Sequence, residues 1–209
     1  MNISKNFFKN KLSLFLFSIF ISLLLVEILL RFMKLGYLNA PLDLDQIVHH
    51  KHPKNLEFVI YDPFNEWGPH LVNYDVNGLR VNTEKKGKIN NKNKIAFIGD
   101  SFTEANQVDF KNSFVGLLEE SYKNTLFKNF GVSSYSPLIY LLLTKNELSS
   151  FRPNIVILQL YFNDFDDDHF YLKKADSTDL NLITSIQPEN KFFFYALFRH
   201  SYLIRFKKK

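Results

Sequence analysis

Apolar residues follow two different periods in the middle of the chain. Three short runs are rich in apolar residues, at 95–98, 126–132 and 154–161. Between them, apolar residues recur at helical spacing over Phe114–Tyr122 and Pro137–Leu148. Strands that alternate with helices and are apolar on both faces are typical of a parallel sheet covered on both sides. The pattern predicts an α/β fold, a three-layer α/β/α sandwich around a parallel sheet.

A second apolar segment lies near the N-terminus. Residues Leu12 to Leu30 are nearly all apolar, and about 20 such residues cross a bilayer as a helix. We therefore expect a transmembrane helix over 12–32. The lysines at 5, 9 and 11 place residues 1–11 in the cytoplasm and the globular part outside it, as a single-pass membrane protein. A cleaved signal peptide is the alternative, but the run is long and no small-x-small cleavage site follows it cleanly.

One acidic residue interrupts the apolar segment near its outer end. Glu27 comes four residues before Arg31, so the two side chains can pair on one helix face. The alternative is that Glu27 only extends to the membrane interface, where water solvates its carboxylate.

Residues 33–93 are expected to form a linker and a small β lead-in region. Prolines punctuate it, Phe58–Tyr61 is a candidate strand, and Asn77-Gly78 predicts the turn of a hairpin. Residues 85–94 are predicted to be a polar, solvated loop. The main domain is assigned to 94–209.

Composition excludes several kinds of chemistry. The net charge of +5 comes mostly from lysines near the two ends, so no arginine-rich face suggests nucleic acid as a partner. The chain has no cysteine, which excludes thiol catalysis and cysteine-bound zinc. His49, His50 and His52 are clustered, but without carboxylates at ligand spacing a solvated linker is the favoured interpretation. No cofactor and no metal is expected.

Polar residues mark the end of each predicted strand. Ser101 follows Gly99-Asp100, Gly131 follows the second strand, and Asn163 follows the third. Active sites of parallel sheets lie at the carboxyl ends of the strands. A serine hydroxyl can attack a carbonyl carbon once a base removes its proton, and backbone N–H groups and a carboxamide can stabilise the oxyanion that forms. We expect Ser101 to be the nucleophile, with the N–H groups of Ser101 and Gly131 and the Asn163 amide as donors.

These segments resemble the SGNH (GDSL-type) hydrolase family. Gly99-Asp100-Ser101-Phe102-Thr103 is similar to the first sequence block of the family, Asn129–Val132 to the second and Tyr161–Asp164 to the third. Asn77–Arg80 is also similar to a segment of membrane-anchored bacterial members. Tyr161 and Phe162 replace residues that are commonly small in the family. The resemblance implies a flavodoxin-like SGNH hydrolase fold and the three site roles given above.

The base of the family is a histidine in an Asp-x-x-His block that comes after the last strand. We expect the chain to be truncated before that block, with three of about five strands readable. Asp166–His169 has the same spacing but follows Asn163 directly, and we interpret it as a solvated acidic loop, with His169 as a possible substitute base. His200 is expected to be packed, and Phe192–Phe206 to be a core helix or an interfacial helix.

The expected function is a membrane-anchored serine esterase acting on an acyl group carried by a carbohydrate or lipid. Two alternatives stay open. The acyl group could pass to a sugar hydroxyl, as in an O-acyltransferase, or the chain could be a non-catalytic remnant that binds a glycan or a partner protein. Phosphate binding at Gly99-Asp100-Ser101 is a further alternative, but no glycine-rich loop accompanies it.

Overall fold

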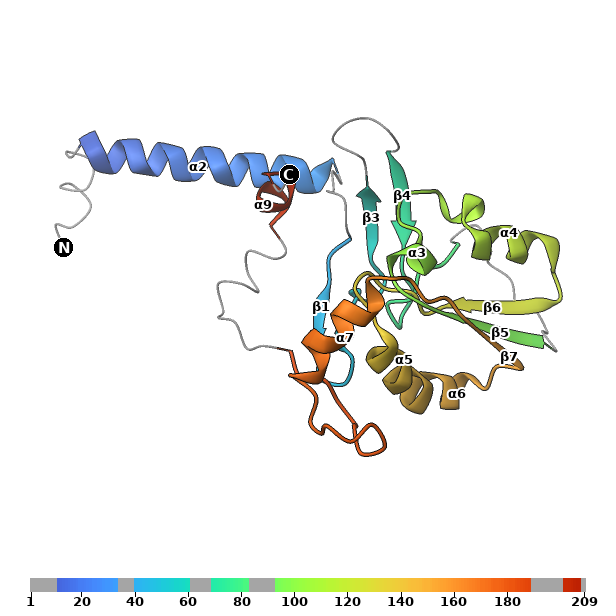
Figure 1. The fold of residues 1–209 in the computed structure, drawn as a ribbon. Helices are drawn as coiled ribbons and strands as arrows, with labels where there is room; N and C mark the ends of the chain where they lie inside the picture. The colour runs from blue at the N-terminus through green and yellow to red at the C-terminus, as the bar shows by residue number, and fades with distance from the viewer. Residues whose placement is uncertain (1–10, 34–39, 61–68, 83–92, 189–200, 208–209) are drawn as a thin grey trace.

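The computed structural model describes residues 11–33, 40–60, 69–82, 93–188 and 201–207. It has the mixed α/β composition that the sequence predicts, with a parallel sheet, helices on both of its faces and one apolar helix at the N-terminus (Figure 1). The helices are α2 (Lys11–Phe32), α3 (Ser101–Glu104), η1 (Phe110–Asn112), α4 (Phe114–Ser121), α5 (Pro137–Leu143), η2 (Thr144–Leu148), α6 (Ser149–Phe151), α7 (Asp164–Leu172) and α9 (Tyr202–Lys207). The strands are β1 (Asp43–Asp45), β2 (His49–Lys51), β3 (Glu57–Ile60), β4 (His70–Asn73), β5 (Asn93–Ile98), β6 (Thr125–Asn129) and β7 (Ile155–Leu158).

The parallel sheet contains the three strands predicted between residues 95 and 161. Its order is β6-β5-β7, and β5 pairs in parallel with both neighbours. Phe97 of β5 lies opposite Asn129 of β6, and Ile98 lies opposite Leu158 of β7. This register brings the carboxyl ends of all three strands to one edge of the sheet, where the candidate residues follow them.

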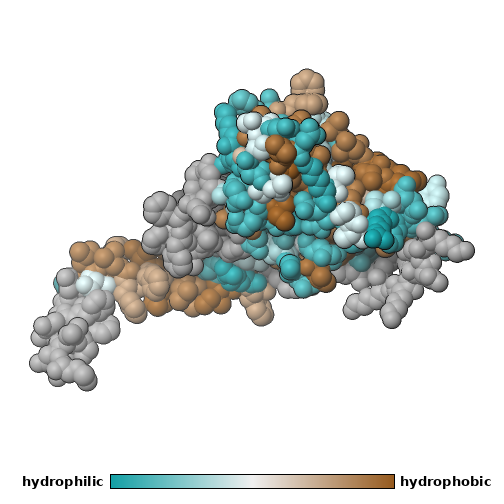
Figure 2. Space-filling view, turned by 90° about the horizontal axis from the view of Figure 1, so that it is seen from below, coloured by the Kyte–Doolittle hydropathy of each residue, from teal (hydrophilic) through white to brown (hydrophobic). Residues whose placement is uncertain are grey.

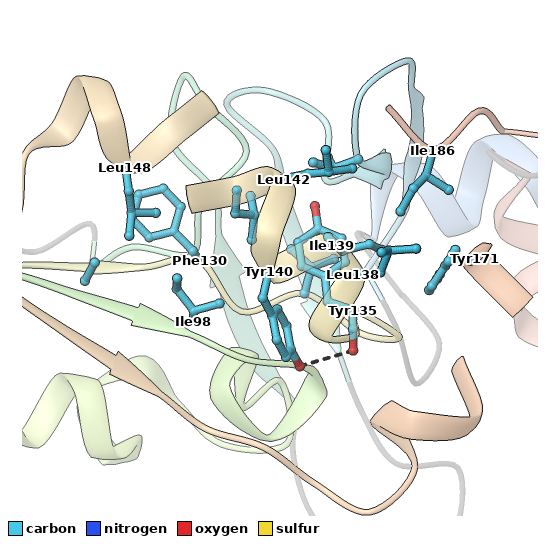
Figure 3. Close-up of a cluster of buried hydrophobic side chains, with 14 of the residues drawn as sticks. Ile98, Phe130, Tyr135, Leu138, Ile139, Tyr140, Leu142, Leu148, Tyr171 and Ile186 are labelled. Carbon is cyan, nitrogen blue, oxygen red and sulfur yellow. Dashed lines mark hydrogen bonds between the residues drawn. The ribbon is translucent and has the colours of Figure 1, made fainter. Parts of the chain in front are cut away.

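Alternate residues of β5 pack into different layers. Ala96 and Ile98 belong to a core formed with α5, η2 and α6, whereas Phe97 packs with Val115 of α4 and Phe127 of β6. In Figure 1, α4 lies above the sheet and α5 and α6 below it. This core is shown in Figure 3, where aromatic and aliphatic side chains of the loop after β6 and of α5 pack between the strands and the helix. The alternation explains why the strands are apolar on both faces.

The predicted helix over Pro137–Leu148 is present, with one irregularity. Pro137 begins α5 at a position where a missing backbone N–H costs nothing. The helix continues through a π-helical segment, η2, into α6 and ends at Arg152, whose φ of 52° is left-handed. The predicted stop at Arg152-Pro153 is therefore confirmed.

The region before the sheet forms two small antiparallel pairs. β1 pairs with β2, and β3 pairs with β4. Asn77-Gly78 does form a turn, since Gly78 has a φ of 77° and its N–H bonds to the carbonyl of Asp75. The strands that flank this turn are reduced to a single bridge between Tyr74 and Arg80, because Asn73 and the residues before it pair with β3 instead.

Two sequence interpretations are wrong in structural detail. His50 and His52 are buried in the packed lead-in region, so they do not belong to a solvated linker. Asp166–His169 is part of helix α7, where carboxylates in the first turn complement the positive end of the helix dipole. The predicted 33–93 boundary falls at the start of β5, and the polar loop over 85–92, Lys5, Lys9 and residues 192–200 lie outside the described residues.

Helix α2 matches the predicted transmembrane segment. It has 22 residues, and its most apolar window has a mean hydropathy of 2.6, so by length and composition it can cross a membrane. Figure 2 shows α2 as a largely apolar rod that projects from the globular part. The predicted pair of Glu27 with Arg31 is confirmed, with 2.7 Å between Oε1 and Nε.

Candidate active site

Ser101 is the first residue of helix α3, immediately after the central strand. Asp100 caps this helix, because its carboxylate accepts a hydrogen bond of 2.9 Å from the N–H of Phe102. The helix has a single turn and ends at Ala105, which has a left-handed φ of 56°. The capped turn holds Ser101 at the edge of the sheet, and within the described part of the chain its hydroxyl makes no hydrogen bond.

Gly131 lies directly against the α3 turn. A Cβ at this position would lie 2.5 Å from the backbone nitrogen of Glu104 and 2.6 Å from Cβ of Thr103. Only glycine permits this approach of the two segments. The N–H of Gly131 donates a bond of 2.8 Å to Oδ1 of Asn129, so the Asn129 side chain fixes the orientation of this peptide.

Asn163 caps the N-terminus of α7 through its backbone carbonyl, which accepts bonds of 3.1 Å from Asp166 and Asp167. Its side chain is exposed and hydrogen-bonds to the Asp167 carboxylate. The amide is therefore at the surface, where a ligand can reach it.

Hydrogen bonds tie the segments carrying these residues to one another. The side chain of Asn129 donates a bond of 2.7 Å to the carbonyl of Thr103, which joins the loop after β6 to α3. Thr103 also donates through its hydroxyl to the side chain of Gln159, at 2.7 Å, which joins α3 to the segment after β7. On the outside, the rings of Phe102 and Tyr161 are 4.2 Å apart. The structure therefore brings the segments of Ser101, Gly131 and Asn163 to the same edge of the sheet.

Two carboxylates are buried beneath this edge. Asp164 accepts bonds from the hydroxyl of Tyr140, at 2.9 Å, and from the N–H of Tyr161, at 3.0 Å. Burial raises the pKa of Asp164, and the nearby carboxylates of Asp100 and Asp168 raise it further. One oxygen of Asp100 and one of Asp164 have no hydrogen-bond partner among the described residues. The raised pKa of Asp164 favours its protonated form.

Glu104 was not predicted from the sequence, although its carboxylate accepts hydrogen bonds from several segments near the site. Glu104 is fully buried, and one of its oxygens accepts bonds from Tyr74 and Asn106 at 2.7 and 2.6 Å. The other oxygen accepts both the N–H and the hydroxyl of Ser133 at 2.8 Å. His52 Nε2 lies 2.6 Å from Oε1 of Glu104. Burial alone would raise the pKa of Glu104, but His52 and these donors hold it at about 2.

Arg80 supports the same turn from the lead-in region. Its buried guanidinium donates to the carbonyls of Glu104, Ala105 and Val108 at the end of α3. Carbonyls at the end of a helix lack intrahelical donors, and Arg80 supplies donors here, although the Ala105 carbonyl also accepts the Val108 N–H at 3.2 Å. The similarity of Asn77–Arg80 to a family segment was the available signal, but nothing in the sequence indicated which groups Arg80 would contact.

The buried histidines are not arranged to remove a proton from Ser101. His52 bonds through Nδ1 to the carbonyl of Pro41 while Nε2 faces Glu104. His50 bonds to the carbonyl of Ser133, at 2.9 Å, and to the ring of His49. Burial lowers the pKa of His50 to about 4. His169 is exposed on α7.

Asp168, in the same helix as His169, has a structural role. It accepts bonds from the hydroxyl of Ser136, at 2.5 Å, and the N–H of Leu138, at 2.8 Å, and so caps helix α5. Asp168 therefore holds α5, whereas the Asp-x-x-His spacing belongs to Asp166 and His169, which are both exposed on α7.

In the part of the chain that the structure describes, no group of three or more histidine, aspartate or glutamate side chains could hold a metal ion. Comparison with known proteins finds no family model that matches the chain and no curated protein that matches it.

Proposed function

We propose that this chain is a membrane-anchored serine esterase of the SGNH type, which acts on an acyl group carried by a carbohydrate or lipid. The observation that carries the proposal is the shared edge of the sheet, where the segments of Ser101, Gly131 and Asn163 are locked together by Asn129, Thr103 and Gln159. The capped turn at Ser101 and the exposed Asn163 amide support the assigned roles.

The reaction has two halves. The Ser101 oxygen forms a bond to the ester carbonyl carbon while a base accepts the hydroxyl proton. The negative charge on the carbonyl oxygen is held by the Ser101 N–H and the Asn163 amide, since the Gly131 N–H already donates to Asn129. The bond to the alcohol then breaks, and the alcohol leaves with the proton. Water attacks the acyl-serine in the second half and releases the acid. Attack by a sugar hydroxyl in place of water would give the O-acyltransferase.

If the proposed function is right, removing an oxyanion donor should lower the rate of ester hydrolysis. Removal of one oxyanion donor typically lowers the rate by about 10²–10³-fold, so Asn163→Ala should fall in this range. The residue that accepts the Ser101 proton is a histidine in the family that the sequence resembles. His169 is the histidine of this chain that follows the Asn163 segment most closely.

A non-catalytic binding protein is the second candidate. It is favoured by one observation: within the described residues the Ser101 hydroxyl has no hydrogen-bonded base. The two candidate functions differ in one measurable property: an esterase hydrolyses an ester repeatedly, whereas a binding protein does not.

The test is hydrolysis of p-nitrophenyl acetate by the full chain in detergent micelles, with Ser101→Ala and the exposed Ser149→Ala as matched serine variants. Turnover lost in Ser101→Ala and kept in Ser149→Ala is the expected result. Turnover equal in all three proteins would reject the esterase. Product analysis with an added acceptor glycan separates hydrolysis from acyl transfer.

A further inference from the structure

We infer that the edge of the sheet bearing Ser101 faces the bilayer that holds α2, so that the substrate is an acyl ester carried at the membrane surface. This inference rests on the proposed function for its chemistry. Its geometry comes from a separate set of contacts, between α2, α9 and the lead-in region.

The first step is that α2 is held against the globular part. Glu27 of α2 accepts bonds from the hydroxyl of Ser201, at 2.8 Å, and from the N–H groups of Tyr202 and Leu203, at 3.1 and 2.9 Å. It therefore caps the start of α9 while also pairing with Arg31. We call this set of contacts the Glu27 latch.

The second step is that α9 also contacts the lead-in region. The ring of Tyr202 lies 5.5 Å from that of Phe58 in β3, and the Arg31 guanidinium lies 5.2 Å from the Tyr202 ring centroid. Phe58 is fully buried in the small core of β3 and β4. Since β4 leads to Tyr74, which bonds to Glu104, a chain of packed residues connects the outer end of α2 to the candidate site.

The third step is the direction of the strands. In Figure 1, α2 runs from left to right, whereas β5, β6 and β7 run from right to left towards α3 and α7. The carboxyl ends of the strands therefore point back towards the side of the molecule where α2 and α9 lie. Figure 2, turned about the horizontal axis, keeps α2 on the same side of the globular part. With α2 across a bilayer, this edge of the sheet faces the membrane.

The fourth step is the surface chemistry of that edge. Four exposed aromatic side chains surround the candidate residues, and we call them the aromatic rim: Phe102, Tyr161, Phe162 and Phe165. Phe162, next to Asn163, is 88% exposed, although it is one of the largest apolar side chains of the chain. Aromatic and apolar side chains at this level partition into the membrane interface.

The charge next to the aromatic rim indicates what drives the contact. Asp166, in the first turn of α7, is exposed and acidic, so attraction to anionic headgroups does not hold the rim at the surface. Burial of aromatic area is the driving term, and a neutral bilayer is therefore the appropriate partner for a test.

The absence of cysteine allows a direct measurement. The full chain is reconstituted in phosphatidylcholine vesicles that contain lipid with a nitroxide on its headgroup. An environment-sensitive fluorophore is attached through Phe162→Cys, and in a control protein through Lys123→Cys, which is exposed near the amino end of β6. We expect quenching at position 162 to be several-fold stronger than at position 123. Equal quenching at the two positions would overturn the inference.

A latch variant tests the proposed cause. Glu27→Leu keeps α2 apolar and removes the three acceptor bonds to α9, so quenching at position 162 should fall towards the value at position 123. Unchanged quenching would overturn the role of the Glu27 latch.

A separate assay tests the substrate class. It compares hydrolysis of an ester on a vesicle-bound lipid with hydrolysis of the same ester free in solution. Preference for the vesicle-borne ester supports the inference, and preference for the free ester contradicts it. Quenching does not depend on turnover: strong quenching with no turnover of either ester would reject the esterase but not the orientation of the rim.

Discussion

Glu104 is the residue on which the geometry of the candidate site most depends. Its two oxygens connect α3, the Ser133 loop and the lead-in residues Tyr74 and His52. A buried carboxylate is expensive to desolvate, and it is tolerated here because each oxygen has donors. The lead-in region is therefore part of the support of the site.

Glu104→Gln should destabilise the chain severely. The amide keeps the volume of the side chain but replaces one acceptor oxygen with a donor, so buried groups that donate to Glu104 lose their acceptor. Each buried polar group left unsatisfied costs about 1–3 kcal/mol. Thermal unfolding of the full chain in detergent, with the exposed Glu120→Gln as control, measures the effect. A melting temperature equal to that of the control would contradict the role assigned to Glu104.

His50 should make stability depend on pH. Its pKa is lowered to about 4 from an ordinary value of 6.5, because burial favours the neutral ring. Above pH 6.5 His50 is neutral in both the folded and the unfolded chain, and the free energy of unfolding is highest. As the pH falls from 6.5 towards 4, the unfolded chain binds a proton that the folded chain does not, and the free energy of unfolding decreases.

Denaturant unfolding of wild type and His50→Gln over pH 7 to 4 tests this effect. The wild type should lose more stability per pH unit than His50→Gln, by up to about 1.4 kcal/mol for the single proton concerned. Identical slopes would show that His50 takes up no proton on unfolding.

Some residues of the candidate site could be predicted from the sequence and others could not. Ser101, Gly131 and Asn163 follow strand ends, and the topology of a parallel sheet is sufficient to predict their shared edge. Glu104 and His52 could not be predicted as partners, because they are far apart in the chain and no local period relates them. Their pairing is decided by how the lead-in region packs on α3.

At the scale of elements, the contact between α3 and the loop after β6 depends on Gly131. Gly131→Ala places a methyl group 2.5 Å from the Glu104 nitrogen, so the two segments must separate. Overpacking of this kind costs about 1–3 kcal/mol. We expect slower reaction of Ser101 with a fluorophosphonate probe and a lower melting temperature.

The neighbouring variant Ala105→Gly is the control for Gly131→Ala. Ala105 has a left-handed φ of 56°, which glycine adopts without strain, and the substitution adds no atom. Its probe reactivity and melting temperature should stay near those of the wild type. If Gly131→Ala behaves in the same way as Ala105→Gly, the close contact is not important.

Helices and strands were predicted correctly where apolar residues repeat with a single period. They were predicted wrongly where contacts with distant segments determine the local structure. The three strands of the parallel sheet and α4 follow from apolar spacing alone. Helix α7 was predicted as a loop because Asp166–Asp168 are charged and follow the Asn163 strand end directly, yet Asp168 is bound by Ser136 and Leu138 of a neighbouring segment. The turn at Gly78 was predicted. The pairing of β4 with β3, in place of the strand after the turn, was not predicted.

At the scale of the whole molecule, β7 is an exposed edge. All four of its residues are apolar and are 40–52% exposed. An edge strand without charge or proline is prone to pair with another chain. We expect the full chain to self-associate with rising concentration in detergent, as measured by sedimentation velocity.

Ile155→Lys should weaken this association, because a charge on an edge strand opposes pairing. Leu117→Lys, on the exposed surface of α4, is the matched control and should leave it unchanged. Equal association of all three proteins would exclude β7 as the contact.

The membrane arrangement was predictable only in part. Hydropathy predicted α2, and the Glu27–Arg31 spacing predicted their pair. The contact of Glu27 with α9 joins residues 174 to 176 positions apart, so no local sequence pattern could indicate it. The proposed orientation of the site relative to the bilayer rests on that contact.

The central claim is that Ser101 is the nucleophile and that the Asn163 amide is an oxyanion donor. The most direct measurement is mass spectrometric mapping of the full chain after treatment with a fluorophosphonate, alongside Ser101→Ala and Asn163→Ala. The account predicts one adduct, on Ser101, formed more slowly in Asn163→Ala and absent from Ser101→Ala. An adduct formed equally in Ser101→Ala, or no adduct in the wild type, would contradict it.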